Sequence, residues 1–131
     1  MKKLNVVIEQ GEDGFFAFVQ EIDGCTAGGL TFLKVKSEIQ RMIRLSIDTD
    51  DTLGNKYAKG YEIIFKYSLE SVFSQFPELN IEVLAKQTGL KRSILKSIID
   101  GSRMATEEEA ESLNIAIQSL ATRLQSLRLT R

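Results

Sequence analysis

The hydrophobic positions along the chain repeat with a period of two residues in the first half and with a helical period in the second half. Leu4, Val6 and Ile8 alternate with residues of the opposite face, which predicts a strand with one buried face. Residues 15–22 are rich in aromatic and branched side chains and predict a second strand. A turn signal at residues 11–14 separates the two runs, so the chain is predicted to begin with a hairpin.

The rest of the first half predicts a short strand, a helix and a last strand. Residues 25–27 predict the short strand, which the two glycines that follow are expected to end. The helix begins after Thr31, a suitable N-cap, and should end near Asp48. Its apolar residues share one face: Val35, Ile39, Met42 and Ile43. A polar segment at residues 48–60 predicts a loop, and the alternation at residues 61–67 predicts the last strand.

The second half predicts four helices. They cover residues 69–76, 81–88, 92–99 and 106 to about 127. Pro77 ends the first of them, because proline cannot continue a helix. Asn80 is predicted to cap the second helix, and Thr106 is predicted to form a capping box with Glu109 at the start of the fourth.

Together the two periods predict an α+β fold with two domains. Residues 1–68 are expected to form a small antiparallel sheet with one face covered by the helix, and residues 69–131 an all-α domain. No long linker marks the boundary near Ser68. The two units are therefore expected to pack closely or to be joined by a short hinge.

The second and third helices of the all-α domain carry the pattern of a helix-turn-helix. Ala85 supplies the small residue where two helices cross, and Gly89 tolerates the positive φ that ends a helix. Four apolar positions are expected to pack between the helices: Leu84, Leu90, Leu95 and Ile98. This spacing resembles the helix-turn-helix of Cro and lambda-repressor-like regulators. The resemblance implies binding to double-stranded DNA, with the second helix in the major groove.

The charge pattern points to the same segment. The whole chain has a formal net charge of −1, whereas five basic residues and one acidic residue lie between Lys86 and Arg103. The residues expected to contact DNA are Lys91, Arg92, Ser93, Lys96, Ser97 and Arg103. Arg92 and Lys96 are one helical turn apart and can face the groove together. The alternative is that these are solvated basic residues on a helical bundle without a DNA target.

The last helix carries a heptad pattern of apolar residues. Its positions are Leu113, Ile117, Leu120, Leu124 and Leu127. The early positions are expected to close the core of the domain, and the last three to form a dimer seam. A homodimer suits a helix-turn-helix protein, since such proteins generally bind two half-sites about one DNA turn apart. The pattern leaves open whether dimers pair into tetramers.

The first half resembles a known family in three segments. They are the hairpin at residues 6–16, the glycine-cysteine segment at 22–29 and the helix that begins at Thr31. Together with the helix-turn-helix pattern, these segments resemble the HicB family of bacterial antitoxins. The resemblance implies a partial RNase H-like fold without its chemistry, which binds and blocks a small RNA-cleaving toxin. It also implies that the protein represses its own operon.

The residue types argue against catalysis. The chain has no histidine, which removes histidine acid–base chemistry and histidine metal ligands, and leaves Cys25 without a histidine to activate it. RNase H chemistry needs converging carboxylates that hold two metal ions. The available carboxylates lie in a turn and near strand ends: Glu9, Asp13, Glu21 and Asp23. We therefore expect no enzyme activity, no catalytic residue, no metal and no cofactor.

The expected location is the cytoplasm. A single cysteine fits a reducing compartment, and acidic residues follow the first basic residues too soon for a signal peptide. No apolar run approaches the ~20 residues of a membrane span. The leading hypothesis is an antitoxin that represses its own operon. The alternative is a stand-alone transcription regulator whose N-terminal domain senses a ligand or another protein.

Overall fold

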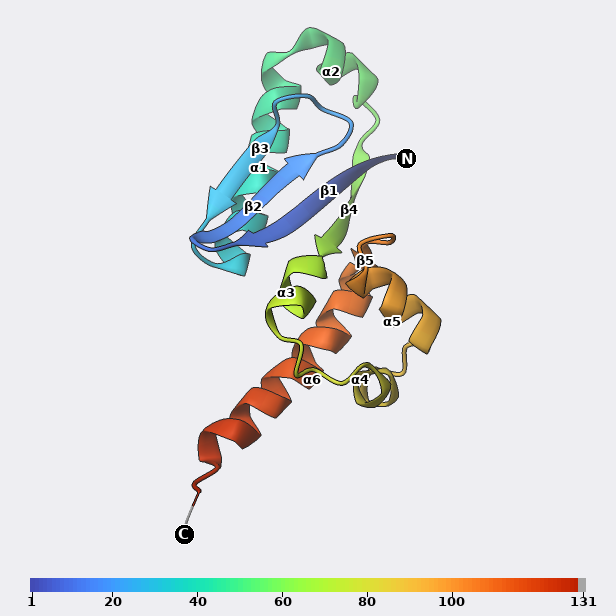
Figure 1. Ribbon diagram of the computed structural model, residues 1–131. Helices are drawn as coiled ribbons and strands as arrows, with labels where there is room; N and C mark the ends of the chain where they lie inside the picture. Colours follow the sequence, from blue (N-terminus) through green and yellow to red (C-terminus); the bar gives the residue numbers. More distant parts are fainter. Residues whose placement is uncertain (130–131) are drawn as a thin grey trace.

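The hairpin follows the alternation of the sequence. In the computed structural model, which describes residues 1–129, β1 (Lys2–Gly11) pairs antiparallel with β2 (Gly14–Val19). Leu4, Val6 and Ile8 are buried on one face of β1, as predicted, but Val7 on the opposite face is also fully buried. Figure 1 shows these strands at the N-terminal end of the molecule, with the helical second half below them.

The sheet is mixed, and the expectation of an antiparallel sheet is wrong. Its five strands are ordered β3-β2-β1-β4-β5. β3 (Thr26–Gly29) is antiparallel to β2, but β4 (Tyr61–Ser68) runs parallel to β1. Parallel neighbours require a crossover, which is provided here by α1 (Phe32–Thr49). The antiparallel neighbour of β4 on its other side is the short β5 (Ala105–Thr106), which comes from the second half.

α1 covers one face of the sheet through the stripe that the sequence predicts. Val35, Ile39 and Ile43 are fully buried, and Met42 is half-buried against the same core. The hydroxyl of Thr31 caps the helix by accepting a hydrogen bond from the Lys34 N–H at 3.1 Å. The N-cap prediction is thus confirmed.

Two local predictions in the first half are wrong. The glycines at 28 and 29 belong to β3, where they pair with residues of β2 instead of ending the strand. Residues 48–60 are not all loop, because α1 continues to Thr49 and α2 (Asp51–Lys56) follows it. The side chain of Asp50 caps α2 by accepting from the Leu53 N–H at 3.1 Å. Leu53 and Tyr57 then pack on the core, although most residues of this segment are exposed.

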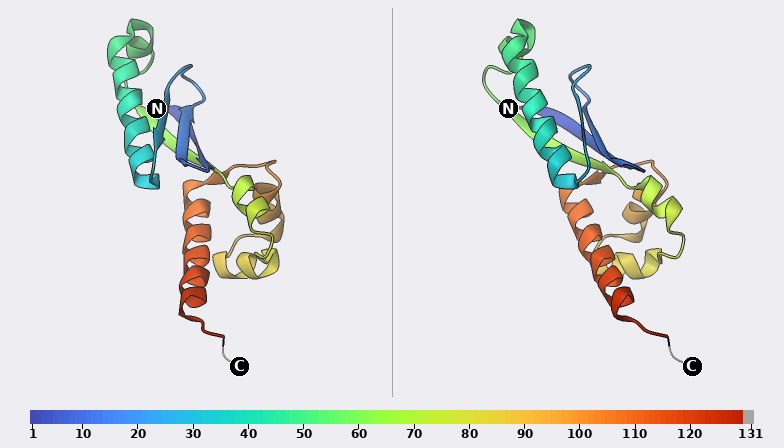
Figure 2. Two further views of the ribbon diagram at one scale, coloured as in Figure 1. Left: turned by 60° about the vertical axis from the view of Figure 1, so that its left-hand side comes forward. Right: turned by 90° about the vertical axis from the view of Figure 1, so that its left-hand side faces the viewer.

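The four helices predicted in the second half are present. They are α3 (Glu70–Gln75), α4 (Ile81–Thr88), α5 (Arg92–Ile99) and α6 (Glu107–Ser126). Asn80 caps α4 by accepting hydrogen bonds from the Glu82 and Val83 N–H groups. The capping box of Thr106 and Glu109 at the start of α6 is complete. The two views in Figure 2 show α3, α4 and α5 on one side of α6.

The hydrophobic core is divided into two clusters. The first joins the sheet, α1 and α2, and also takes in Ile98 of α5 and Ala105 of β5. The second lies among the helices and contains Phe73, Leu84, Leu95, Leu113 and Ala116. Leu69 packs against both clusters. Figure 2 shows the start of α1 near the start of α6, where Lys36 pairs with Glu107 and Ala110 packs against the first cluster.

Gly29 brings β3 close to the first turn of α1, and we predict that Gly29→Ala is destabilising. An added Cβ would lie 2.8 Å from the backbone nitrogen of Val35, and backbone cannot move aside as a side chain can. The expected loss is about 1–3 kcal/mol, measured by urea unfolding. Gly28→Ala is the control, because its Cβ would meet the nearest atom at an ordinary 3.7 Å. Equal stability of the two variants would contradict the close approach.

Candidate nucleic-acid interface

The turn between α4 and α5 depends on Gly89. Its φ of 75° lies in the left-handed region, and its N–H donates to the Ala85 carbonyl at 3.0 Å to end α4. The hydroxyl of Thr88 donates to the Leu84 carbonyl at 2.7 Å and accepts from the Leu90 N–H at 3.3 Å. A hydrogen-bonded threonine thus reinforces the turn on one side of the glycine.

The inner faces of α4 and α5 are buried, but not in one place. Leu84 and Leu95 lie in the helical cluster, with Ala85 and Leu90 packed against it. Ile98, predicted to lie between the two helices, belongs to the first cluster with the sheet. α5 is therefore anchored on both the helical unit and the sheet, which fixes the direction of its outer face.

The outer face of α5 collects most of the predicted DNA-contact residues. Lys91, Arg92, Ser93 and Lys96 are all exposed. Ser97 is half-buried, and its hydroxyl donates to the Ser93 carbonyl at 2.8 Å. Lys91 precedes the helix in an extended conformation, and no side chain caps the first turn of α5.

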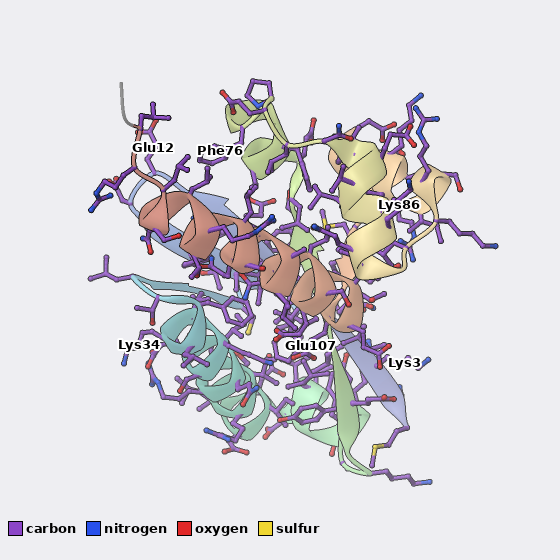
Figure 3. The ribbon with its side chains drawn as sticks, turned by 90° about the horizontal axis from the view of Figure 1, so that it is seen from below. Lys3, Glu12, Lys34, Phe76, Lys86 and Glu107 are labelled. Carbon is purple, nitrogen blue, oxygen red and sulfur yellow. The ribbon has the colours of Figure 1, made fainter. Side chains whose placement is uncertain are left out.

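The basic residues around this face differ in their partners. Lys86, Lys91 and Lys96 form no ion pair with the described part of the chain. The guanidinium of Arg92 pairs with Glu82 of α4 through a 2.6 Å contact between Nε and Oε1, and both side chains are mostly exposed. Figure 3 shows Lys86 on α4, on the side of α6 away from α1. The three free lysines give this side of the molecule an unneutralised positive charge.

Arg103 is held more firmly than the other predicted DNA-contact residues. Its Nη1 donates to both carboxylate oxygens of Glu109 at 2.9 Å. Burial raises the pKa of Glu109, but the Thr106 N–H and the Arg103 guanidinium outweigh it, so the pKa is lowered overall. Because Glu109 also belongs to the capping box, Arg103 ties the loop after α5 to the start of α6. The capping-box motif in the sequence signals the role of Glu109, but nothing local signals its arginine partner.

Two acidic residues border the face, and sequence reasoning missed the contact that Glu82 makes there. Asp100 accepts hydrogen bonds from the hydroxyl and N–H of Ser102 at 2.6 and 3.0 Å, which lowers the pKa of its carboxyl group. It therefore stays ionised near neutral pH. Glu82 carries a negative charge to Arg92 from the neighbouring helix. Glu82 and Arg92 are ten positions apart in the chain, so no helical or strand spacing signals their pairing.

The residues of the predicted dimer seam differ in exposure along α6. Leu113 is fully buried in the helical cluster, and Ile117 and Leu120 are half-buried. Leu124 and Leu127 are 59% and 58% exposed, and Leu127 is the C-cap of the helix. Figure 1 shows the end of α6 extending beyond the other helices toward the C-terminus.

The carboxylates of the first half do not converge. Glu21 accepts hydrogen bonds from the backbone and the side chain of Asn5. Within residues 1–129, no group of three His, Cys, Asp or Glu side chains is placed to hold a metal ion. Cys25 is buried, and burial raises the pKa of its thiol against a smaller opposing effect of Ser46.

Comparison with known proteins adds no family to this description. No protein-family model matches the chain, and neither the curated proteins nor the solved structures give a significant match. Over the described residues, no helix combines the length and apolar character that crossing a membrane requires.

Proposed function

We propose that the protein is a DNA-binding repressor in which α4 and α5 act as a helix-turn-helix. The observation that carries this proposal is the two-sided character of α5: Leu95 and Ile98 are buried, while Arg92 and Lys96 are exposed one turn apart. In this arrangement α5 enters the major groove with its first residues on the base edges. Arg92 is the residue best suited to a guanine, since arginine donates to two acceptors of that base.

The surrounding groups would position the DNA backbone. Lys86 and Lys91 are exposed cations on either side of the turn and are suited to phosphates. The uncapped first turn of α5 adds backbone N–H groups, which favour an anion at a helix N-terminus. Arg103 is a positioning residue in this proposal, because Glu109 occupies its guanidinium.

The proposal includes a homodimer formed through the end of α6. Leu120, Leu124 and Leu127 continue the heptad beyond the helical cluster; Leu120 is half-buried, and the other two are exposed. Exposed leucines at these spacings favour pairing with a second copy of the helix. Two helix-turn-helix units held in this way would contact two half-sites of an operator.

For the first half we propose the role of a HicB-type antitoxin with a partial RNase H-like fold and no catalytic activity. The partner would be a small toxin that cleaves RNA, and the two proteins would bind each other in the cytoplasm. Support comes from the sheet face opposite α1, where Phe16 is 46% exposed and its ring lies 6.4 Å from that of Phe18. Phe16 and its neighbour Phe18 would offer an aromatic contact to a protein partner, beside the fully buried Val7 of the same face.

A second candidate is a stand-alone regulator whose DNA binding responds to a small ligand. It is favoured by a cavity between the start of α1 and the start of α6. The product of the neighbouring gene distinguishes the two candidate functions. An antitoxin requires a toxin partner, whereas a stand-alone regulator does not.

The DNA-binding proposal predicts that Arg92→Ala weakens operator binding by about 5- to 150-fold, equivalent to ~1–3 kcal/mol. Binding is measured by fluorescence anisotropy on a duplex that the wild-type protein selects from a randomised library. Arg123→Ala, an exposed arginine on α6, is the control for the lost charge. Glu82→Gln should strengthen binding up to about fivefold, because it frees Arg92 and removes an acidic group. Equal affinity of the wild-type protein and Arg92→Ala would contradict the assignment of α5.

The dimer proposal predicts that Leu124→Ser combined with Leu127→Ser gives monomers in light scattering. The two substitutions replace apolar contacts of the seam by polar side chains without touching the buried part of α6. Ile115→Ser is the control, because Ile115 is 61% exposed on the same helix but lies outside the heptad. If the double variant remains dimeric, the interface lies elsewhere.

The antitoxin proposal predicts that the full chain co-purifies with the small basic protein encoded by a neighbouring gene and restores growth when that protein is toxic. Phe16→Asp should abolish both effects, since it places a charge at the exposed aromatic position of the sheet face opposite α1. Leu45→Asp is the control on the outer face of α1, where Leu45 is similarly exposed at 47%. If the wild-type chain neither binds nor restores growth, the antitoxin role is wrong and the ligand-responsive regulator remains.

A further inference from the structure

A cavity of about 420 Å³ lies where the two halves of the molecule meet. One wall is the first two turns of α1, the floor comes from β1, β2 and β4, and the other wall is the start of α6. Figure 2 shows α1 and α6 approaching each other at this point, and Figure 3 shows Glu107 on the side of α6 that faces α1. The volume is in the range of small-molecule sites, which are often found between domains.

The apolar part of the cavity is a row of three aromatic rings. The ring of Phe32 lies between those of Phe15 and Tyr67, with centroid distances of 6.1 and 5.5 Å. The rings come from α1, β2 and β4, so they depend on the packing of the sheet against the helix. Ile8 and Ala110 complete this apolar surface. Such a surface accommodates an aromatic or aliphatic group.

Tyr67 also brings an unsatisfied polar atom to the cavity. The residue is 6% exposed, and its hydroxyl has no hydrogen-bond partner in the described part of the chain. Burial raises the pKa of the phenol, and the charges of Glu107 and Glu111 raise it further, so the hydroxyl stays neutral. A buried hydroxyl without a partner costs free energy that a bound polar group would recover.

The charged groups of the cavity leave one carboxylate in excess. The ammonium of Lys36 pairs with Glu107, which joins α1 to α6, and lies 4.6 Å from the centre of the Phe65 ring. Glu111, one turn further along α6, lines the cavity and forms no ion pair with the described residues. The local charge therefore favours a cation over an anion.

We propose that this cavity binds a small primary amine with an aromatic body. The ammonium group lies between the Glu111 carboxylate and the Tyr67 oxygen and donates a hydrogen bond to each. The aromatic ring packs against Phe15 and Phe32. A slight separation of α1 and α6 gives the ligand access to the covered phenol oxygen.

Binding at this position would change the contact between the two halves. The cavity wall on α6 begins at Glu107, directly after the β5 strand that pairs with β4. The same end of α6 holds Arg103 through Glu109. An amine bound in the cavity would therefore change the position of α5 relative to the sheet. This regulatory step, unlike the binding itself, rests on the proposed DNA-binding function.

The first experiment is isothermal titration calorimetry of the full chain with 2-phenylethylamine at neutral pH. We expect a dissociation constant at or below about 1 mM, as suits a ligand of this size. Two compounds of similar shape are the comparison: neutral 2-phenylethanol and anionic 3-phenylpropionate should each bind at least about tenfold more weakly. Equal binding of the three compounds, or no binding of the amine, would overturn the proposal.

Three variants test the contacts. Tyr67→Phe should weaken amine binding about tenfold while leaving the folded protein intact, because it removes only an unpaired hydroxyl. Glu111→Gln should weaken it about fivefold. Glu108→Gln is the matched control, an exposed acidic residue on the same helix that does not line the cavity. Losses for Glu111→Gln that do not exceed those for Glu108→Gln would overturn the assignment of the cation site.

A separate measurement tests the regulatory step. The anisotropy titration with the selected duplex is repeated with and without saturating 2-phenylethylamine. A change in DNA affinity that Tyr67→Phe suppresses supports coupling between the cavity and α5. If the amine binds by calorimetry and the DNA affinity is unchanged, coupling is wrong and the binding site stands. If no duplex is selected at all, the DNA-binding proposal fails independently of the cavity.

Discussion

The parallel pairing of β1 with β4 sets how the other strands and helices are arranged. It runs over eight residue pairs, from Lys2 opposite Tyr61 to Glu9 opposite Ser68. α1 must cross the sheet to make this pairing, and in doing so it buries its apolar face. β4 then ends where the helical half begins and offers its free edge to β5. The position of the helical half follows from the place of this one strand.

α6 connects the regions to which we assign functions. Its first turns form a wall of the cavity and bind Arg103. Its middle closes the helical cluster with Leu113 and Ala116, and its end carries the exposed leucines. A single helix in contact with each region offers a physical route by which a change at the proposed amine site would reach the face proposed to bind DNA.

The electrostatic character of each surface depends on which charged side chains form ion pairs there, not on the net charge of the chain. The formal net charge is −1, yet the side of the molecule around α4 and α5 carries three lysines without an ion pair among the described residues. The arginines of the same segment form ion pairs: Arg92 with Glu82, and Arg103 with Glu109. In the proposed complex the lysines would contact the DNA backbone as point charges, whereas Arg92 would act through the fixed geometry of its guanidinium.

Local sequence patterns were enough to predict several features: the capped helix starts at Thr31, Asn80 and Thr106, the left-handed Gly89, and the exposed Arg92 and Lys96 of the candidate site. These features depend on interactions within about one helical turn, or on a regular alternation, and so can be predicted from the order of residues. Long-range packing sets four other features: the direction of β4, the inclusion of the two glycines in β3, the partners of Arg92 and Arg103, and the cavity around Tyr67. Each of these joins residues far apart in the chain, and their meeting is set by how the apolar surfaces pack, which no short stretch of sequence specifies.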